Sequence, residues 1–107
     1  MTEPQIRPPE RCTSMGELRD QIDRLDKALV KLLSERQRYI ERAAEIKPDR
    51  DTVRDEARIA DVLAKVLAEA ANTGLRAQIA EPVWRTLMES SIAYEFQAFD
   101  AKAQRAR

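Results

Sequence analysis

Two cations lie on the apolar face of a predicted helix, where they could bind an anion. Between Leu18 and Lys47 apolar residues recur every three or four positions, which predicts one long amphipathic helix. At about 100° per residue, Arg36 falls in the middle of the apolar stripe, and Lys47, three turns later, lies within about 20° of it. The stripe contains no Asp or Glu. Either a ligand supplies the opposing charge, or both side chains lay their stems on apolar surface and extend their charged ends into water.

Further polar residues border the apolar faces of two later predicted helices. Arg58 borders the face of the second helix, and Ser91 and Glu95 share the apolar arc of the third. Each residue taken singly is typical of the boundary of a buried face. Together with Arg36 and Lys47 they place three cations, a hydroxyl and a carboxyl around one interior, which indicates a site for an anionic small molecule.

Composition excludes several classes of function. The chain has 107 residues with 19 Lys and Arg against 19 Asp and Glu, so it lacks the basic excess of a nucleic-acid or anionic-membrane surface. There is no His, and Cys12 is the only Cys, which argues against zinc sites, disulfide frameworks and His-based acid–base catalysis. No apolar run approaches the ~20 residues of a membrane span, and no signal peptide is visible. We expect a cytoplasmic protein with one domain and a modest core.

The elements that must position these residues are predicted to be helices. Two Gly, few β-branched residues and 36% charged residues indicate an all-α chain. Residues 1–13 hold three of the five Pro and are expected to form an extended arm. The helical domain is expected over residues 14–103, followed by a tail at 104–107.

Local signals set the expected limits of three helices. Ser14 to Glu17 has the spacing of a capping box and should open the first helix, which ends at about Ile46 before Pro48. The second helix is expected from about Val53 to Ala71, with Gly74 as its cap. The third is expected over about 79–102, with Pro82 in its first turn or at a kink.

The first helix is long for a chain of this size. About 33 residues at ~1.5 Å each give about 50 Å, which two shorter helices would not cover. This length predicts an intertwined homodimer. The break that follows, Pro48 to Asp55, is expected to act as a lid with Lys47 at its hinge.

At this point the chain resembles a known family. The segments "ELRDQIDRLDKALVKLLSERQRYIERAAEIK" and "VRDEARIADVLAKV" resemble the all-α class of chorismate mutases, and the likeness extends from about Leu18 to Phe99. The motifs that carry it are LRxxID, LLxER and a Lys eleven residues after the Arg. The resemblance implies a homodimer of three-helix chains, with each active site completed by the first helix of the partner.

The resemblance also implies roles for individual residues. Arg19 would reach across from the partner chain to a substrate carboxylate, Arg36 would hold a carboxylate from its own chain, and Lys47 would donate to the ether oxygen and a carboxylate. Glu95 matches a Gln that donates to the ether oxygen. The catalytic set would thus be Arg36, Lys47 and Glu95, and further substrate contacts would come from Asp55, Arg58, Ile59 and Ser91.

The implied reaction is the Claisen rearrangement of chorismate, a small dicarboxylate, to prephenate. It needs the substrate to be held in its compact diaxial conformer and negative charge to be stabilised on the breaking ether oxygen. Neither a cofactor nor a metal is required.

Ile59 departs from the mutase pattern. Bacterial mutases commonly carry there a Glu that accepts from the C4 hydroxyl of chorismate. An apolar residue at this position, and the stretch "PERCT" from Pro9 to Thr13, resemble the related isochorismate-pyruvate lyases, whose substrate carries its hydroxyl at C2. Alternatively, Ile59 simply packs within the apolar stripe of the second helix.

Glu95 is the second departure, since it replaces the usual Gln, as in fungal mutases. An ionised carboxylate cannot donate a hydrogen bond. We hypothesise that Glu95 acts in its protonated form, because desolvation disfavours the charged one. The competing possibility is an ionised Glu95 paired with Lys47 or Arg58, which would impair catalysis.

Several functions therefore remain open. Chorismate mutase leads, and an isochorismate-pyruvate lyase giving salicylate and pyruvate is the main alternative, with both reactions possible in one site. A 4-amino-4-deoxychorismate mutase and a non-catalytic helical dimerisation module are the more distant ones.

Overall fold

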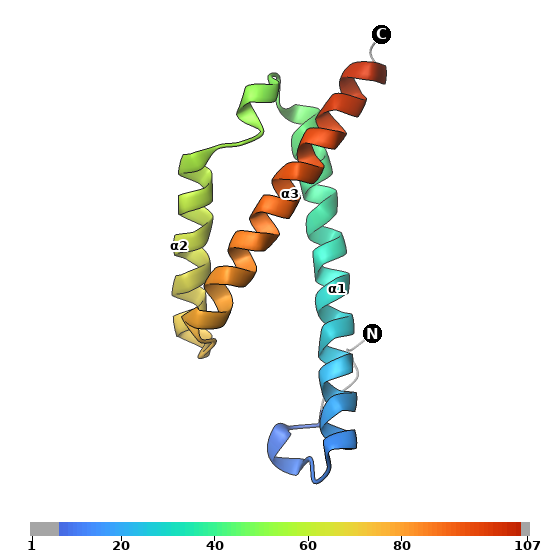
Figure 1. The fold of residues 1–107 in the computed structure, drawn as a ribbon, viewed down its shortest axis with the longest axis vertical. Helices are drawn as coiled ribbons and strands as arrows, with labels where there is room; N and C mark the ends of the chain where they lie inside the picture. The colour runs from blue at the N-terminus through green and yellow to red at the C-terminus, as the bar shows by residue number, and fades with distance from the viewer. Residues whose placement is uncertain (1–6, 106–107) are drawn as a thin grey trace. The chain divides into compact units, whose positions relative to one another are not determined.

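All regular secondary structure is helical in the part of the protein that its computed structural model describes, residues 7–105 (Figure 1). The elements in order are the 3-10 turn η1 (Pro9–Arg11), α1 (Met15–Ile46), the 3-10 turn η2 (Arg50–Thr52), α2 (Glu56–Thr73) and α3 (Ala77–Arg105). No strand occurs among these residues, so the predicted all-α class with three helices is confirmed. The chain divides into two compact units, Met1–Arg38 and Tyr39–Arg107, and the boundary falls within α1.

The first unit begins with a well-capped helix. Ser14 Oγ accepts from the backbone N–H of Glu17 at 3.1 Å, as the capping-box spacing predicts. The carboxylate of Glu17 turns back to Thr13, whose hydroxyl donates to it at 3.1 Å, and to Arg7 at 2.8 Å. Hydrogen bonds from Thr13 are the main reason that the pKa of Glu17 lies below its usual value, and the charge of Arg7 adds to them.

The N-terminal arm is not extended throughout, in contrast to the prediction. Pro9–Arg11 form a 3-10 turn, closed by a 3.0 Å bond from the Arg11 N–H to Pro8 O. Pro9 is suited to the first position of such a turn, because its φ is preset and it has no N–H to satisfy. Residues 1–6 of the predicted arm lie outside the described part.

The apolar stripe of α1 remains exposed in the first unit. Within this unit's described residues no side chain is buried. Each large residue of the stripe is between 43% and 60% exposed to solvent, namely Ile22, Leu25, Leu29, Leu32 and Leu33. A single helix has nothing to fold against, so this unit has no core of its own.

In the second unit α2 and α3 form a hairpin around Gly74 (Figure 1). Gly74 adopts φ 86°, the left-handed conformation that ends a helix, and its N–H and that of Leu75 both donate to Ala70 O at 2.9 Å. The predicted cap is therefore confirmed. Pro82 lies in the second turn of α3, because the helix begins at Ala77, two residues earlier than expected.

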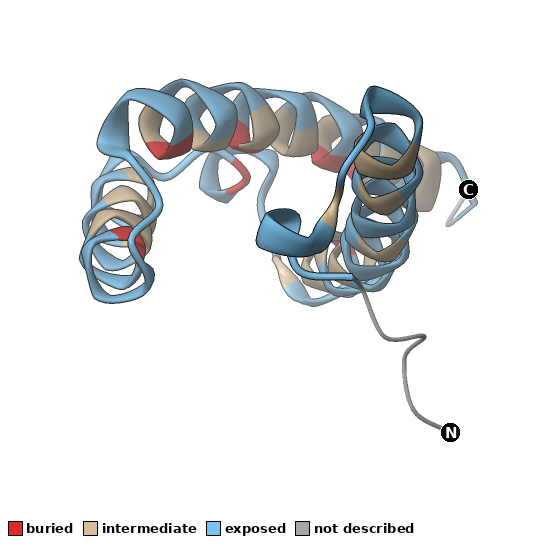
Figure 2. Cartoon of the chain, turned by 90° about the horizontal axis from the view of Figure 1, so that it is seen from below, coloured by how far each residue is buried: buried red, intermediate tan, exposed pale blue. Residues whose placement is uncertain are grey.

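The predicted start of α2 at Val53 is wrong by three residues. Asp55 caps α2 by accepting from the Arg58 N–H at 3.1 Å, so the helix begins at Glu56. Val53 precedes the cap and is instead 3% exposed, in a core cluster with Ala44 and Phe99. The core is small, as Figure 2 shows from the few red segments among largely exposed helices. It lies where the end of α1, the segment 47–55 and the second half of α3 meet.

None of the helices in the described range is both long and apolar enough to span a membrane.

Candidate functional site

Lys47 and Glu95 face each other in the interior of the second unit. Lys47 follows the last residue of α1, and its ammonium lies 2.7 Å from Glu95 Oε2 while donating to Val53 O at 3.3 Å. The side chain of Lys47 is 28% exposed and that of Glu95 only 6%. Among the described residues no group donates a well-aligned hydrogen bond to Glu95 Oε2. The contact between Lys47 and Glu95 is therefore electrostatic, and Oε2 can still accept a hydrogen bond.

The helical period explains why Glu95 is buried. Met88 precedes it by two turns and Phe99 follows it by one, and both are buried on the same face of α3. A carboxyl on this face must find a partner, because burying an unpaired charge is costly. The partner is a Lys that projects from the start of the segment 47–55. This pair matches the competing interpretation of Glu95, in which it pairs with Lys47.

The segment 47–55 is tied to α3 at two points on the protein surface. Arg50 Nε donates to Asp100 at 2.9 Å, and its guanidinium lies 4.5 Å from the centre of the Phe96 ring. Arg54 binds Glu89 with two bonds of 2.9 Å, which raises the pKa of the guanidinium and lowers that of the carboxyl. The segment expected to act as a lid thus carries the turn η2 and two ion pairs to α3.

Asp55 and Arg58 make local interactions on α2. Asp55 is the helix cap described above, and the exposed Arg58 pairs with Asp61 at 2.8 Å. Asp61 also accepts from Lys65 at 3.0 Å, and the hydrogen bond from Lys65 is the main cause that lowers its pKa. Both predicted substrate contacts therefore have structural partners on their own helix.

Ser91 and Ile59 are both half-buried. Ser91 lies one turn before Glu95 on α3, so the two share a face, and its hydroxyl donates to Leu87 O at 2.7 Å. Ile59 follows Arg58 on α2. Arg19 and Arg36 belong to the first unit, where Arg19 is exposed and Arg36 is half-buried. The structure thus brings Lys47 together with Glu95, and Ser91 lies next to them along α3.

Lys102 is a residue that the sequence reasoning missed. Its ammonium donates to Ala44 O at 3.0 Å and to Lys47 O at 2.9 Å, so it contacts the backbone of the candidate site. Its signal in the sequence is its position, seven residues after Glu95 and three after Phe99, which places it on the same face of α3.

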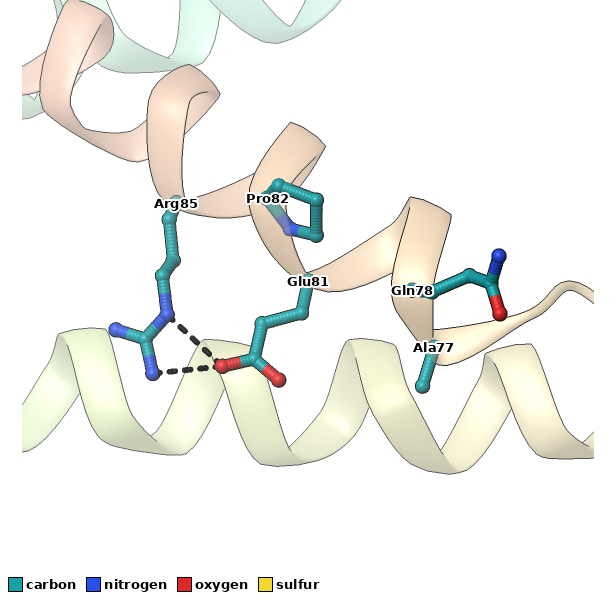
Figure 3. A pocket seen from close by; sticks show the side chains of 5 residues that line it. All are labelled: Ala77, Gln78, Glu81, Pro82 and Arg85. Atoms are coloured by element: carbon teal, nitrogen blue, oxygen red, sulfur yellow. Dashed lines mark hydrogen bonds and ion pairs between the residues drawn. The ribbon is translucent and has the colours of Figure 1, made fainter.

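A hollow of about 320 Å³ at the start of α3 is a weaker candidate (Figure 3). Its charged lining residues, Glu81 and Arg85, bind each other at 3.0 Å. They therefore neutralise each other and leave no net charge for a dicarboxylate. The remaining lining residues are Ala77, Gln78 and Pro82, and none of the five was a predicted site residue.

Comparison with known proteins places these residues in a wider context. Residues 18–96 match the family described as chorismate mutase type II, a range that contains every predicted site residue. An isochorismate pyruvate lyase from Pseudomonas aeruginosa is 27% identical over 92 residues, covering 86% of this chain and 91% of that protein.

Proposed function

Because the chain belongs to the chorismate mutase type II family, we propose that it rearranges chorismate to prephenate at a site built around Lys47 and Glu95. The family match carries this proposal, and the 2.7 Å approach of Lys47 to Glu95 supports the placement of the two groups at one site. The pairing itself would impair catalysis, so the substrate has to separate it. As the bond to the ether oxygen breaks, negative charge grows on that oxygen. Hydrogen-bond donors already in place there stabilise the transition state more than the ground state.

Lys47 and Glu95 would supply the two donors. The ammonium of Lys47 carries three N–H groups and uses one on Val53 O, which leaves others for a substrate. Glu95 can donate only when it is protonated. Binding of the substrate would separate the ion pair of the free chain, and Glu95 would take up a proton from solvent. The ether oxygen would then lie between the two donors, each worth roughly 3 kcal/mol.

Arginines would hold the two carboxylates of the substrate. We propose Arg36 from the same chain and Arg19 from a partner chain, with Arg58 released from Asp61 as a further contact. Asp55, Ile59 and Ser91 would complete the binding surface. The exposed stripe of α1 supports a homodimer, because a second copy would cover leucines such as Leu29 and Leu32, which are 55% and 60% exposed.

A second candidate reaction is the cleavage of isochorismate to salicylate and pyruvate. The name of the Pseudomonas aeruginosa relative favours it, and so does the apolar Ile59 in place of an acceptor for the C4 hydroxyl. The same restraint of conformation and the same donors at the ether oxygen would serve both reactions.

The decisive experiment offers the purified protein chorismate and isochorismate separately and identifies the products. Prephenate as the main product supports the mutase, and salicylate with little prephenate supports the lyase. Lys47→Met should lower either activity by roughly 100-fold or more and leave a residual rate, whereas Lys65→Met, which removes an exposed Lys bonded to Asp61, should not. Turnover of neither substrate refutes the proposal and favours an aminated substrate or a non-catalytic dimerisation module.

A further inference from the structure

The C-terminal end of α1 is capped by a Lys from a distant part of the chain. Lys102 of α3 donates to Ala44 O at 3.0 Å, Glu45 O at 3.4 Å and Lys47 O at 2.9 Å. These carbonyls lie at or beyond the last turn of the helix and have no intrahelical partner. The last turn of α1 has no basic residue of its own, so Lys102 supplies the cation that the negative end of the helix dipole favours.

Packing holds Lys102 in this position. Its ammonium lies 4.2 Å from the centre of the Phe99 ring, a distance at which a cation and an aromatic face attract each other. Phe99 packs in turn with Ala44 and Val53 in the core cluster. The Lys102 cap and the core cluster thus both involve Ala44 and Phe99, and both lie beside the backbone of Lys47.

Each polar group of Lys47 has a defined partner. Its N–H donates to Ala43 O at 2.9 Å, its carbonyl accepts from Lys102, and its ammonium contacts Glu95 and Val53 O. The N–H bond continues the helix, whereas the bond to the carbonyl comes from α3, the helix that also carries Glu95. Lys102 therefore sets the backbone of Lys47 relative to Glu95.

We propose that Lys102 is a positioning residue for the reaction, acting through Lys47. This inference rests on the proposed function. Lys102 does not need to touch the substrate, because its bond to Lys47 O determines the point from which the Lys47 side chain extends. Catalytic groups must be held within about 0.5 Å of their productive geometry, and a displacement of about 1 Å can lower the rate 100-fold.

Substitution of Lys102 tests the proposal, because loss of a positioning residue should lower kcat and change KM little. Lys102→Met keeps an unbranched stem beside Phe99 and removes the donors and the charge. We expect kcat to fall about 10-fold or more with KM changed less than about threefold, because substrate affinity depends mainly on other cations. Lys102→Arg retains donors and charge and should recover part of kcat. Lys65→Met is the matched control and should change neither constant.

A double-mutant cycle separates positioning from a general loss of stability. In a Lys47→Met background the group that Lys102 positions is gone, so adding Lys102→Met should lower the residual kcat by less than about threefold. Equal losses in both backgrounds, or an unchanged kcat in Lys102→Met, would overturn the proposal.

Amide hydrogen exchange provides a readout that needs no activity. In Lys102→Met the amides of Lys47, Thr52 and Val53 should exchange faster, because they belong to the backbone that the cap holds. The amides of Gly74 and Leu75 in the α2–α3 turn should not change. If the wild-type protein turns over neither substrate, the proposed function fails, but amide exchange in Lys102→Met still tests whether Lys102 holds this backbone. Unchanged exchange at 47–53 in the variant would reject the positioning role.

Discussion

Replacing Glu95 with Gln tests whether the buried carboxyl works as a hydrogen-bond donor. Gln has nearly the same shape but donates at every pH, whereas Glu95 donates only when protonated. If Glu95 acts as a donor, the variant keeps a donor at this position and loses the ion pair with Lys47. We therefore expect Glu95→Gln to be at least as fast as the wild type across the pH range of the assay.

The size of the effect follows from the arrangement of the pair. Loss of one preorganised donor at a growing negative charge costs roughly 3 kcal/mol, which is about 100-fold in kcat. The substitution also removes the charge that holds the Lys47 ammonium at 2.7 Å, and so leaves this group available for the ether oxygen. Both effects favour the variant, by up to about 100-fold in kcat.

Stability should fall less than for a fully buried ion pair. Removing one partner of a fully buried pair costs about 3–5 kcal/mol. The Lys47 side chain is 28% exposed and keeps its bond to Val53 O, so we expect a loss below about 3 kcal/mol and a folded variant.

The assay measures kcat for the preferred substrate from about pH 5 to pH 9, with folding verified by circular dichroism at each pH. Glu81→Gln is the matched control, since it makes the same change on α3 at a carboxyl paired with Arg85. It should keep the wild-type profile. A kcat of Glu95→Gln below that of the wild type throughout this range would refute the donor role of Glu95.

Four further predictions test the specificity, the assembly and the fold. Ile59→Glu should raise the ratio of chorismate to isochorismate turnover in the paired assay, because a carboxylate can accept from the C4 hydroxyl; an unchanged ratio would mean that Ile59 only packs. Leu29→Glu places a charge on the exposed stripe and should shift a homodimer to monomer in sedimentation analysis. Gly74→Ala should lower the free energy of unfolding by about 1 kcal/mol in urea titrations, since nothing lies within 4 Å of an added Cβ and φ 86° alone is strained. Arg54→Ala should lower Tm at neutral pH, and the difference in Tm from the wild type should shrink on acidification. Arg54 lowers the pKa of Glu89 in the folded state. The stabilisation from this pair is therefore present above the unfolded-state pKa and is lost as the pH falls through the folded-state pKa.

The sequence by itself determined the helices and two of their caps, because these depend on neighbouring residues. The periodicity of apolar residues predicted α1, and Ser14 and Gly74 predicted their caps correctly. The start of α2 was wrong because Val53 continues the apolar pattern, whereas the chain begins the helix after the Asp55 cap. Charges on an apolar face and the family motifs also singled out Lys47 and Glu95 as candidate catalytic residues.

Only the tertiary structure decided which of these groups meet. Lys47 and Glu95 are distant in sequence, and their 2.7 Å contact depends on how the end of α1 packs against α3. The cap from Lys102 has the same origin. The carbonyls of Ala44, Glu45 and Lys47 meet one ammonium because α3, which carries Lys102, packs its Phe99 against Ala44 and Val53. Local propensity carries no information on such contacts, because the partners lie far apart in the sequence and are brought together by burial of the shared core.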